Sequence, residues 1–323
     1  MSILQKLSIT IAGAALISFG SVASAKPASS SYYSITDLGT FVPTDINNKG
    51  QVVGVGDGRA LLYSDDRFTE ISKLRSDDNV VTPDAINDKG EVVGTSTNIG
   101  VSSRVFLYSD GITQDLGIEG SASDINNKGE VVGSSSDSAF LYSGGTTTII
   151  NSNNASAFGI NNKGQVVGYA GVPNRAFLYD NGITNDIGTL PPYDSSSASA
   201  INDKGSVVGS LSYSAFPPIY DTSAFLYSRS TGMTNLGRLL PTDIFSYASD
   251  INNKGQVVGY SGNFEGFRAF LYSNGRLQDL NNLIPPNSGI TLNFVNAIND
   301  KGQIVGTGLI NGQQHGFLLT PTK

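Results

Sequence analysis

The aromatic side chains outside any repeated motif are the first residues of this chain that could serve a chemical function. They gather in four segments of irregular sequence, residues 189–197, 211–222, 239–247 and 261–267. Exposed aromatic rings in a group offer a surface on which sugar rings or a partner chain can stack. The alternative is that these rings fold back and seal their own loops. The residues concerned are Tyr193, Tyr213, Phe216, Tyr220, Phe245, Tyr247, Phe264 and Phe267.

Arginines form a second candidate group, because a guanidinium can hold a carboxylate through two parallel hydrogen bonds. Four of them open equivalent short segments, at Arg59, Arg104, Arg175 and Arg268. Uronic acids or acidic peptides are therefore conceivable ligands. The alternative is a structural pairing with a neighbouring repeat. The acidic residues available for that pairing are Asp37, Asp45, Asp115, Asp124, Asp186, Asp250 and Asp279.

Acidic residues could also bind a metal or act in catalysis. Asp45, Asp124 and Asp250 could point into a central channel and hold Ca²⁺, but the chain has no Asp-x-Asp-x-Asp-Gly loop. A glycosidase works with two carboxylates, and the irregular segments hold Asp194, Asp221, Asp243 and Glu265, which nothing in the sequence pairs. The chain has no nucleophile elbow or Walker loop, and its one histidine, His315, occupies a repeat position. We therefore expect no catalytic residue, no metal and no cofactor.

A five-residue motif, Ile-Asn-(Asn or Asp)-Lys-Gly, organises the chain. Its occurrences are separated by 40, 39, 35, 41, 50 and 47 residues, a spacing typical of propeller blades or helical arrays. Each motif predicts a tight turn with glycine in the left-handed conformation, followed by a short β-branched strand. The motifs begin at Ile46, Ile86, Ile125, Ile160, Ile201, Ile251 and Ile298.

Each repeat predicts four short antiparallel strands, here named A to D in chain order. Strand A precedes the motif, and strand B, which follows it, carries Val-Val-Gly or, in the last repeat, Ile-Val-Gly. Strand C resembles residues 175–179, Arg-Ala-Phe-Leu-Tyr, and strand D resembles residues 112–117, Ile-Thr-Gln-Asp-Leu-Gly. Two-residue turns such as Asn181-Gly182 join C to D. Because the large apolar residues of strand C recur in every repeat, we expect them in the core rather than around a cofactor.

The last repeat lacks strand D, and the missing strand lies at the other end of the chain. Residues 32–40 contain the strand D motif at Ile35–Gly39. This segment should pair with the last repeat and close a ring, which removes the free sheet edges. The sequence therefore predicts an all-β fold, a seven-bladed β-propeller over about residues 32–320. A β-solenoid, which needs polar end caps instead of a displaced strand, is the alternative.

The motif followed by x-Ala-Phe-Leu-Tyr resembles the HAF-repeat family of probable extracellular bacterial proteins. The family is named for a His-Ala-Phe triplet. The resemblance covers residues 33–320 and implies a repeat fold and export, but no catalytic residue. Six of the equivalent triplets here begin with Arg or Ser, and His315-Gly316-Phe317 alone keeps the histidine. The missing histidines put any histidine-dependent role in doubt.

The N-terminus has the features of a cleavable secretory signal. Lys6 precedes an apolar run over residues 7–20, and Ala23-Ser24-Ala25 has the small residues that signal peptidase accepts. We expect residues 1–25 to be the signal peptide, 26–31 a short linker and 32–323 one propeller domain. The mature protein would be extracellular or periplasmic, without stable membrane insertion. The net charge of −7 argues against nucleic acid as a partner, and the absence of cysteine means that export brings no disulfides.

The variable loops of such a propeller, between strands B and C and between D and A, lie on one face, where binding usually resides. We therefore expect a secreted, monomeric, non-catalytic recognition or scaffold protein that binds a glycan or a protein partner there. The alternative is a polysaccharide hydrolase or lyase with paired carboxylates on the same face. The predicted ligand-binding residues are Tyr193, Tyr213, Phe216, Tyr220, Phe245, Tyr247, Phe264, Arg175 and Arg268.

Overall fold

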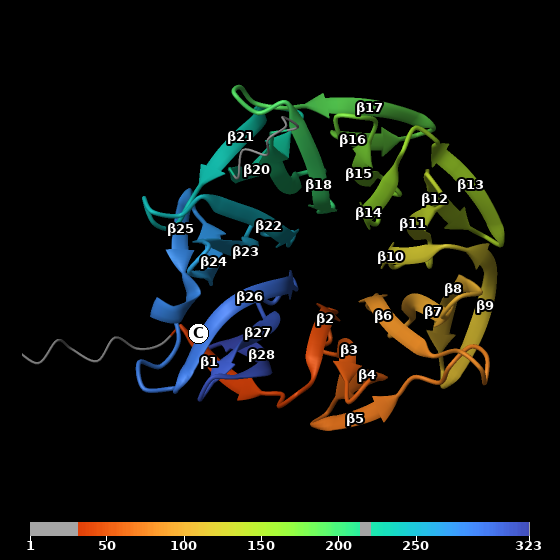
Figure 1. Cartoon of the computed structure of the whole chain (residues 1–323), viewed down its shortest axis with the longest axis horizontal. Helices are drawn as coiled ribbons and strands as arrows, with labels where there is room; N and C mark the ends of the chain where they lie inside the picture. Colours follow the sequence, from red (N-terminus) through yellow and green to blue (C-terminus); the bar gives the residue numbers. More distant parts are fainter. Residues whose placement is uncertain (1–31, 214–220, 323) are drawn as a thin grey trace, which may run out of the picture. The chain divides into compact units, whose positions relative to one another are not determined.

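The computed structural model describes residues 32–213 and 221–322. This part of the chain forms seven four-stranded antiparallel sheets, arranged as blades around a central channel (Figure 1). The first strand of each motif-bearing unit is the innermost strand of its blade. The predicted seven-bladed β-propeller is confirmed, and the β-solenoid is wrong.

Blades 1 to 4 follow one another along the chain. Blade 1 consists of β2 (Val42–Ile46), β3 (Val52–Gly56), β4 (Arg59–Ser64) and β5 (Arg67–Glu70). Blade 2 consists of β6 (Val80–Ile86), β7 (Val92–Asn98), β8 (Ser102–Ser109) and β9 (Ile112–Glu119). Blade 3 consists of β10 (Ser121–Ile125), β11 (Val131–Ser135), β12 (Ser138–Ser143) and β13 (Thr146–Asn151). Blade 4 consists of β14 (Ser156–Ile160), β15 (Val166–Ala170), β16 (Arg175–Asp180) and β17 (Ile183–Gly188).

Blades 5 to 7 complete the circle. Blade 5 consists of β18 (Ser195–Ile201), β19 (Val207–Ser212), β20 (Thr222–Ser228) and β21 (Gly232–Gly237). Blade 6 consists of β22 (Phe245–Ile251), β23 (Val257–Asn263), β24 (Gly266–Ser273) and β25 (Arg276–Asp279), followed by the 3₁₀ helix η1 (Leu280–Asn282). Blade 7 consists of β26 (Ile290–Ile298), β27 (Ile304–Ile310), β28 (Gln313–Pro321) and β1 (Tyr33–Asp37). No helix in the described residues is long and apolar enough to cross a membrane.

The N-terminal strand closes the ring as the sequence predicts. β1 is the outer strand of blade 7 and pairs with β28 in antiparallel register, from Tyr33 opposite Pro321 to Asp37 opposite Phe317. Tyr33 is buried in the core between blades 6 and 7. The chain then turns at Gly39 into blade 1, so two segments from opposite ends of the sequence share one sheet.

The core lies between neighbouring blades and is built from strands B and C. In blade 4, the adjacent valines Val166 and Val167 are both fully buried because successive side chains point to opposite faces of a sheet. Val166 packs in one cluster with Phe177 of its own blade, whereas Val167 packs with Phe225 of blade 5. The strand C aromatics are therefore core residues, as expected.

The glycine that ends each Val-Val-Gly is required by close packing. Strand A carries a β-bulge opposite this glycine in every blade, between Ala157 and Gly159 in blade 4. A Cβ atom at Gly168 would overlap the carbonyl oxygen of Ser156. This explains why the repeated phrase ends in glycine although its backbone there is an ordinary strand.

Candidate functional site

The first asparagine of each motif joins its blade to the next one around the central channel. Its Nδ2 donates to the backbone carbonyl of the equivalent asparagine in the following blade, and Asn299 of blade 7 donates to Asn47 of blade 1. The seven bonds measure 2.9–3.0 Å and form a closed circle. These asparagines are buried. The members of this asparagine ring are Asn47, Asn87, Asn126, Asn161, Asn202, Asn252 and Asn299.

The same asparagine also shapes the turn in which it lies. In blade 3, the Oδ1 of Asn126 accepts hydrogen bonds from the backbone N–H groups of Lys128 and Glu130, both at 3.0 Å. Its Nδ2 donates to the side chain of Glu130 as well as to the Asn161 carbonyl. The glycine between them, Gly129, has a φ of +83°, as the turn type predicts. One side chain therefore fixes both the turn and the contact between two blades.

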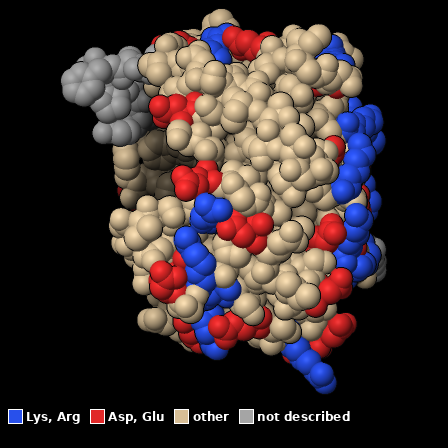
Figure 2. All heavy atoms as spheres, turned by 90° about the vertical axis from the view of Figure 1, so that its right-hand side faces the viewer, with Lys and Arg blue, Asp and Glu red and all other residues tan. Residues whose placement is uncertain are grey.

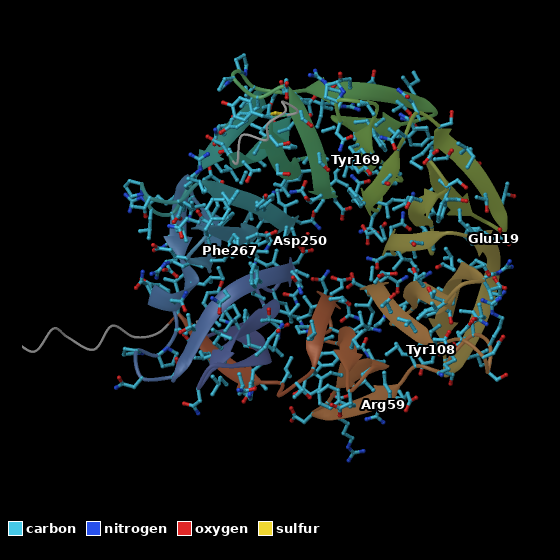
Figure 3. All side chains as sticks on the ribbon, viewed as in Figure 1. Arg59, Tyr108, Glu119, Tyr169, Asp250 and Phe267 are labelled. Carbon is cyan, nitrogen blue, oxygen red and sulfur yellow. The ribbon has the colours of Figure 1, made fainter. Side chains whose placement is uncertain are left out.

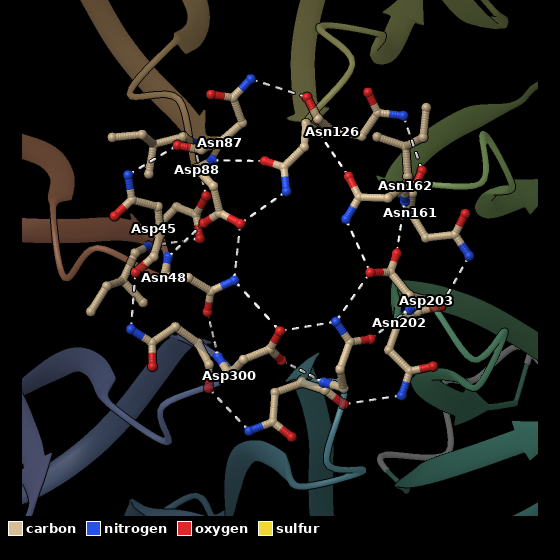
Figure 4. A pocket seen from close by; sticks show the side chains of 18 of the residues that line it. Asp45, Asn48, Asn87, Asp88, Asn126, Asn161, Asn162, Asn202, Asp203 and Asp300 are labelled. Atoms are coloured by element: carbon tan, nitrogen blue, oxygen red, sulfur yellow. Dashed lines mark hydrogen bonds between the residues drawn. The ribbon is translucent and has the colours of Figure 1, made fainter.

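The next motif residue, written as either Asn or Asp, forms a second closed circle (Figure 4). Its backbone N–H donates to the side-chain oxygen of the equivalent residue in the next blade, at 2.7–2.8 Å in all seven turns. The members of this amide–carboxylate ring are Asn48, Asp88, Asn127, Asn162, Asp203, Asn253 and Asp300.

Asn and Asp alternate around the amide–carboxylate ring, and the contacts between blades give the reason. Each carboxylate has an amide on both sides: Asp88 accepts from the Nδ2 of Asn48 and of Asn127, at 3.1 and 2.9 Å. Because the number of blades is odd, strict alternation must fail once, and it fails between Asn127 and Asn162. The ring residues line a cavity of about 160 Å³ at the channel mouth. The carboxylates of this ring already accept hydrogen bonds from the neighbouring amides.

Three further carboxylates, Asp45, Asp124 and Asp250, each join a pair of blades deeper in the ring. The two oxygens of Asp250 accept the backbone N–H of Ile251, at 2.7 Å, and that of Ile298 in blade 7, at 2.8 Å. Asp45 and Asp124 bridge blades 1 to 2 and 3 to 4 in the same way. Figure 3 shows Asp250 at the inner end of blade 6. These residues are structural staples, not partners of the strand C arginines.

Burial raises the pKa of these carboxyl groups. The pKa of Asp45 rises to about 6, chiefly through burial, although the N–H groups of Ile86 and Ile46 counteract it. The pKa of Asp250 rises to about 7 for the same reason, with Asp45 adding repulsion. The pKa of Asp124 also lies well above its usual value. Each side chain keeps some exposed surface, which moderates the effect of burial on stability.

The protein is expected to be more stable near pH 5 than near pH 8. The folded state keeps protons on Asp45, Asp84 and Asp250 up to about pH 6–7, whereas an unfolded chain releases them near pH 4. The contribution of these three carboxyl groups to the free energy of unfolding is therefore complete below about pH 4. It is lost progressively as the pH rises to about 7. Thermal melting over this range measures the effect.

Asp84→Asn provides a matched variant for the pH prediction. Burial raises the pKa of Asp84 to about 7, and its carboxylate accepts the Thr95 hydroxyl at 3.0 Å. Asparagine retains an oxygen for that hydrogen bond but cannot ionise. The melting temperature of the Asp84→Asn variant should fall less between pH 5 and 8 than that of the parent protein. A melting temperature that climbs steadily over this range would contradict the assignment of raised pKa values.

On the opposite face, where the variable loops lie, aromatic rings of blades 6 and 7 pack into one continuous group. Phe245 lies 5.3 Å from Phe264 and 6.2 Å from Phe267, measured between ring centroids. Tyr260 lies at 5.1 Å from both Tyr247 and Phe294. We call this group the aromatic platform: Phe245, Tyr247, Tyr260, Phe264, Phe267 and Phe294.

The aromatic platform borders a pocket of about 340 Å³ with a mixed lining. Phe264 is 75% exposed and Phe294 is 36% exposed, whereas the other platform rings are only partly accessible. Phe267 and Phe294 form the apolar side of the pocket, and Asn293, Glu265 and Gln314 are among its polar side chains. In Figure 3, Phe267 lies farther from the channel than Asp250 of the same blade. The pocket is thus a loop-face site, separate from the channel.

The predicted aromatic cluster divides into two groups. Phe245, Tyr247, Phe264 and Phe267 belong to the platform, but Tyr193 and Tyr213 stack on each other in blade 5, at 5.1 Å. Tyr193 is only 9% exposed and donates its hydroxyl hydrogen to Asp221, which also pairs with Arg238. These two tyrosines seal their own blade, as the alternative interpretation holds. Phe216 and Tyr220 lie outside the described residues.

Two platform residues, Tyr260 and Phe294, are absent from the sequence prediction. Tyr260 directly follows a Val-Val-Gly phrase and looks like part of the framework. The strand register carries the missing signal: Ile251 pairs with Val257, and the bulge between Ala248 and Asp250 shifts the register by one residue, so Tyr247 lies opposite Tyr260. Phe294 joins them only because blade 7 packs beside blade 6, which no local pattern states.

The strand C arginines pair within their own blades, not with a neighbouring repeat. Each contacts the acidic residue eleven positions later: Arg104 meets Asp115 at 3.0 Å, Arg175 meets Asp186 at 3.1 Å, and Arg268 meets Asp279 at 3.4 Å. Arg59 similarly faces Glu70 at 3.5 Å. The arginines therefore pair with acidic residues of strand D, as the structural alternative expects. The expectation that the partner lies in a neighbouring blade is wrong.

His315 occupies the arginine position in blade 7, and its partner Asp37 comes from β1. Their side chains approach to 2.9 Å across the ring closure. Burial alone would raise the pKa of Asp37, but the hydrogen bonds from His315 and from the Gly39 N–H lower it overall. The same carboxylate thus caps the turn after β1 and holds β28.

Two of the remaining acidic candidates are held by structural partners. Asp221 is engaged by Arg238 and Tyr193, and Asp243 is buried and accepts hydrogen bonds from Ser261 and the Leu240 N–H. Glu265 borders the platform pocket. Within residues 32–213 and 221–322, no three His, Cys, Asp or Glu side chains are grouped as a metal site.

The fold and its two faces define a seven-bladed β-propeller with a polar channel and an aromatic loop-face site. The family described as "Protein of unknown function (DUF3466)" matches residues 183–319, which include β17 of blade 4, blades 5 and 6, and most of blade 7. No curated protein matches the chain at a significant level.

Solved structures share the fold at very low sequence identity. A streptogramin B lyase is 9% identical with a TM-score of 0.58, covering 89% of this chain and 98% of its own. The β-propeller domain of the trilobed protease from Pyrococcus furiosus is 9% identical, with a TM-score of 0.56 and coverage of 89% and 95%. YCF48 bound to a D1 peptide is 11% identical, with a TM-score of 0.57 and coverage of 90% and 96%. At such identities, the likeness establishes the propeller fold alone.

Proposed function

We propose that this chain is a secreted, non-catalytic recognition protein that binds an extracellular glycan or a protein partner through the aromatic platform. The observation that carries the proposal is the exposure of Phe264 and Phe294 beside a pocket with a mixed lining. Exposed aromatic faces next to a few polar groups are typical of ligand sites that use stacking for affinity and hydrogen bonds for orientation.

The polar side chains of the pocket favour a glycan over a purely apolar partner. Asn293 donates its Nδ2 to the Phe267 carbonyl, and its side-chain oxygen has no hydrogen-bond partner in the described residues. Glu265 and Gln314 supply further acceptors and donors at the rim. A sugar ring presents both an apolar face and hydroxyl groups, so it matches this lining. Arg268 stands on the strand that carries Phe267 and keeps more than a third of its surface exposed.

Export is part of the proposal and rests on sequence features. Residues 1–25 have the composition of a cleavable signal, and the repeats resemble the HAF-repeat family, which implies an extracellular or periplasmic location. The carboxylates of the loop face favour recognition over hydrolysis, because Asp221 and Asp243 already serve structural partners.

Replacing Phe264 and Phe294 together with alanine is expected to weaken polysaccharide binding about tenfold or more. The two rings supply exposed aromatic surface without forming the blade core, so the melting temperature should change little. Loss of two stacking contacts is worth about 1–3 kcal/mol. Affinity electrophoresis over a panel of neutral and acidic polysaccharides, followed by titration calorimetry, measures the change.

Phe68→Ala is the matched control for the double variant. Phe68 is 46% exposed, belongs to β5 of blade 1, and contacts Phe41 and Tyr63. It should leave polysaccharide affinity unchanged. Equal affinity of the parent and the Phe264→Ala/Phe294→Ala variant would reject the platform as the site. Release of shortened or unsaturated products from any polysaccharide would instead support the enzymatic alternative.

A further inference from the structure

Lysines gather on the face opposite the aromatic platform. Of the lysines in the described residues, all but Lys73 occupy the constant fourth position of the repeated motif. Every one of these turn lysines is exposed. We call them the lysine ring: Lys49, Lys89, Lys128, Lys163, Lys204, Lys254 and Lys301.

The lysine ring surrounds one mouth of the channel. Each lysine directly follows a member of the amide–carboxylate ring, and those members are hydrogen-bonded around a closed circle. Figure 2 shows Lys and Arg side chains as a nearly continuous band along its right-hand edge, the side that faces away from the viewer in Figure 1. The positive charges therefore lie on one face and point to solvent together.

Among the described residues, one of these ammonium groups forms an ion pair within 4 Å, and Lys49 and Lys163 act on Asp88 and Asp180 at longer range. Lys89 lies 3.8 Å from Glu91, and Lys49 donates to the Lys89 carbonyl at 3.3 Å. For the other five, no carboxylate lies within 4 Å in the described part of the chain. The three carboxylates of the amide–carboxylate ring are inside the mouth and already accept amide hydrogens. Glu91 and Glu130, which directly follow two of the turns, bring the carboxylates near the mouth to five, so the seven lysines still exceed them.

The outer part of the same face carries nearly balanced charge. The turns between strands C and D contribute acidic residues at Asp65, Asp66, Asp110 and Asp180. They also contribute Arg67, Arg229 and Arg276, and Arg229 pairs with Asp180 at 2.5 Å. The positive excess of this face therefore belongs to the lysine ring.

We propose that the lysine ring docks the propeller on the surface of a bilayer rich in anionic phospholipid. A ligand that entered the channel would meet Asp88, Asp203 and Asp300, whereas a plane lying across the mouth contacts the lysines first. Lysine is a compact point charge on a long flexible stem, which suits headgroup phosphates without fixed geometry. Each lysine near an anionic surface contributes about 1 kcal/mol, so several acting together give stable peripheral binding. This docking would leave the aromatic platform facing away from the membrane, and it does not depend on the proposed function.

Flotation with lipid vesicles tests the proposal on the mature chain. Vesicles of phosphatidylglycerol and phosphatidylcholine should bind the protein at low salt, and pure phosphatidylcholine vesicles should not. Binding should decline steeply as salt is raised, because screening acts on exposed charges. Lys128→Gln with Lys254→Gln should weaken the partition coefficient about thirtyfold, without a change in melting, since both side chains are exposed.

Arg59→Gln with Arg104→Gln is the charge-matched control. These arginines lie at the start of strand C, on the loop face, so the same loss of net charge should change vesicle binding less than threefold. Equal weakening by both double variants would show a dependence on net charge alone and overturn the docking face. Absence of binding to the anionic vesicles would also overturn the proposal. Binding to soluble polyphosphate but not to vesicles would replace the bilayer with a free polyanion.

Discussion

Deleting residues 32–37 is expected to lower the free energy of unfolding by about 5 kcal/mol, enough to remove most of the stability of a typical domain. The deletion removes β1, its five-residue pairing with β28, and the buried ring of Tyr33. It also leaves the N–H and C=O groups of β28 unpaired at a sheet edge, which invites association with other chains. Urea denaturation measures the loss, and light scattering reports the association.

A circular permutant separates ring closure from chain order. The Thr322 N–H already donates to the Tyr32 carbonyl at 3.0 Å, so the two chain segments are adjacent in space. A chain that starts at Thr40, with residues 32–39 attached after Thr322 through Asn-Gly, restores strand D as a hairpin like those of other blades. Its stability should return close to that of the parent. A deletion variant that unfolds at the same urea concentration as the parent would disprove the closing role of β1.

Asn126→Ala is expected to lower the free energy of unfolding by about 3–5 kcal/mol, a large effect for one polar side chain. The change leaves the part-buried N–H groups of Lys128 and Glu130 and the buried Asn161 carbonyl without their side-chain partner. Burying such groups unpaired costs about 1–3 kcal/mol each. Urea denaturation again provides the measurement.

Two further variants show whether the effect belongs to the asparagine ring. Asn126→Asp keeps both acceptor bonds but places a carboxylate against the Asn161 carbonyl and the Glu130 side chain, so it should be nearly as damaging. Lys128→Ala, in the same turn, removes only an exposed side chain and should change stability by less than about 0.5 kcal/mol. If Asn126→Ala proves as mild as Lys128→Ala, the asparagine does not hold the blades together.

The sequence by itself determined the fold of this protein. The recurrence of the motif indicates seven similar units, and the displaced Ile35–Gly39 segment predicts how they close. The turn glycines and the alternating strand C residues also behave as their patterns predict. These features can be predicted from the sequence because they depend on residues only a few positions apart. Comparison of the seven repeats also separates the constant residues from the variable ones.

Only the tertiary structure decided what joins one unit to the next. The asparagine ring and the amide–carboxylate ring connect residues 35 to 50 positions apart, and Asn299 reaches Asn47 across most of the chain. The grouping of the aromatic residues also depends on tertiary contacts. Tyr193 packs into the core of blade 5, whereas Phe294 of blade 7 joins the aromatic platform of blade 6. Such contacts depend on the circular closure of the blades, which brings residues together through space and leaves no trace in the local spacing of their types.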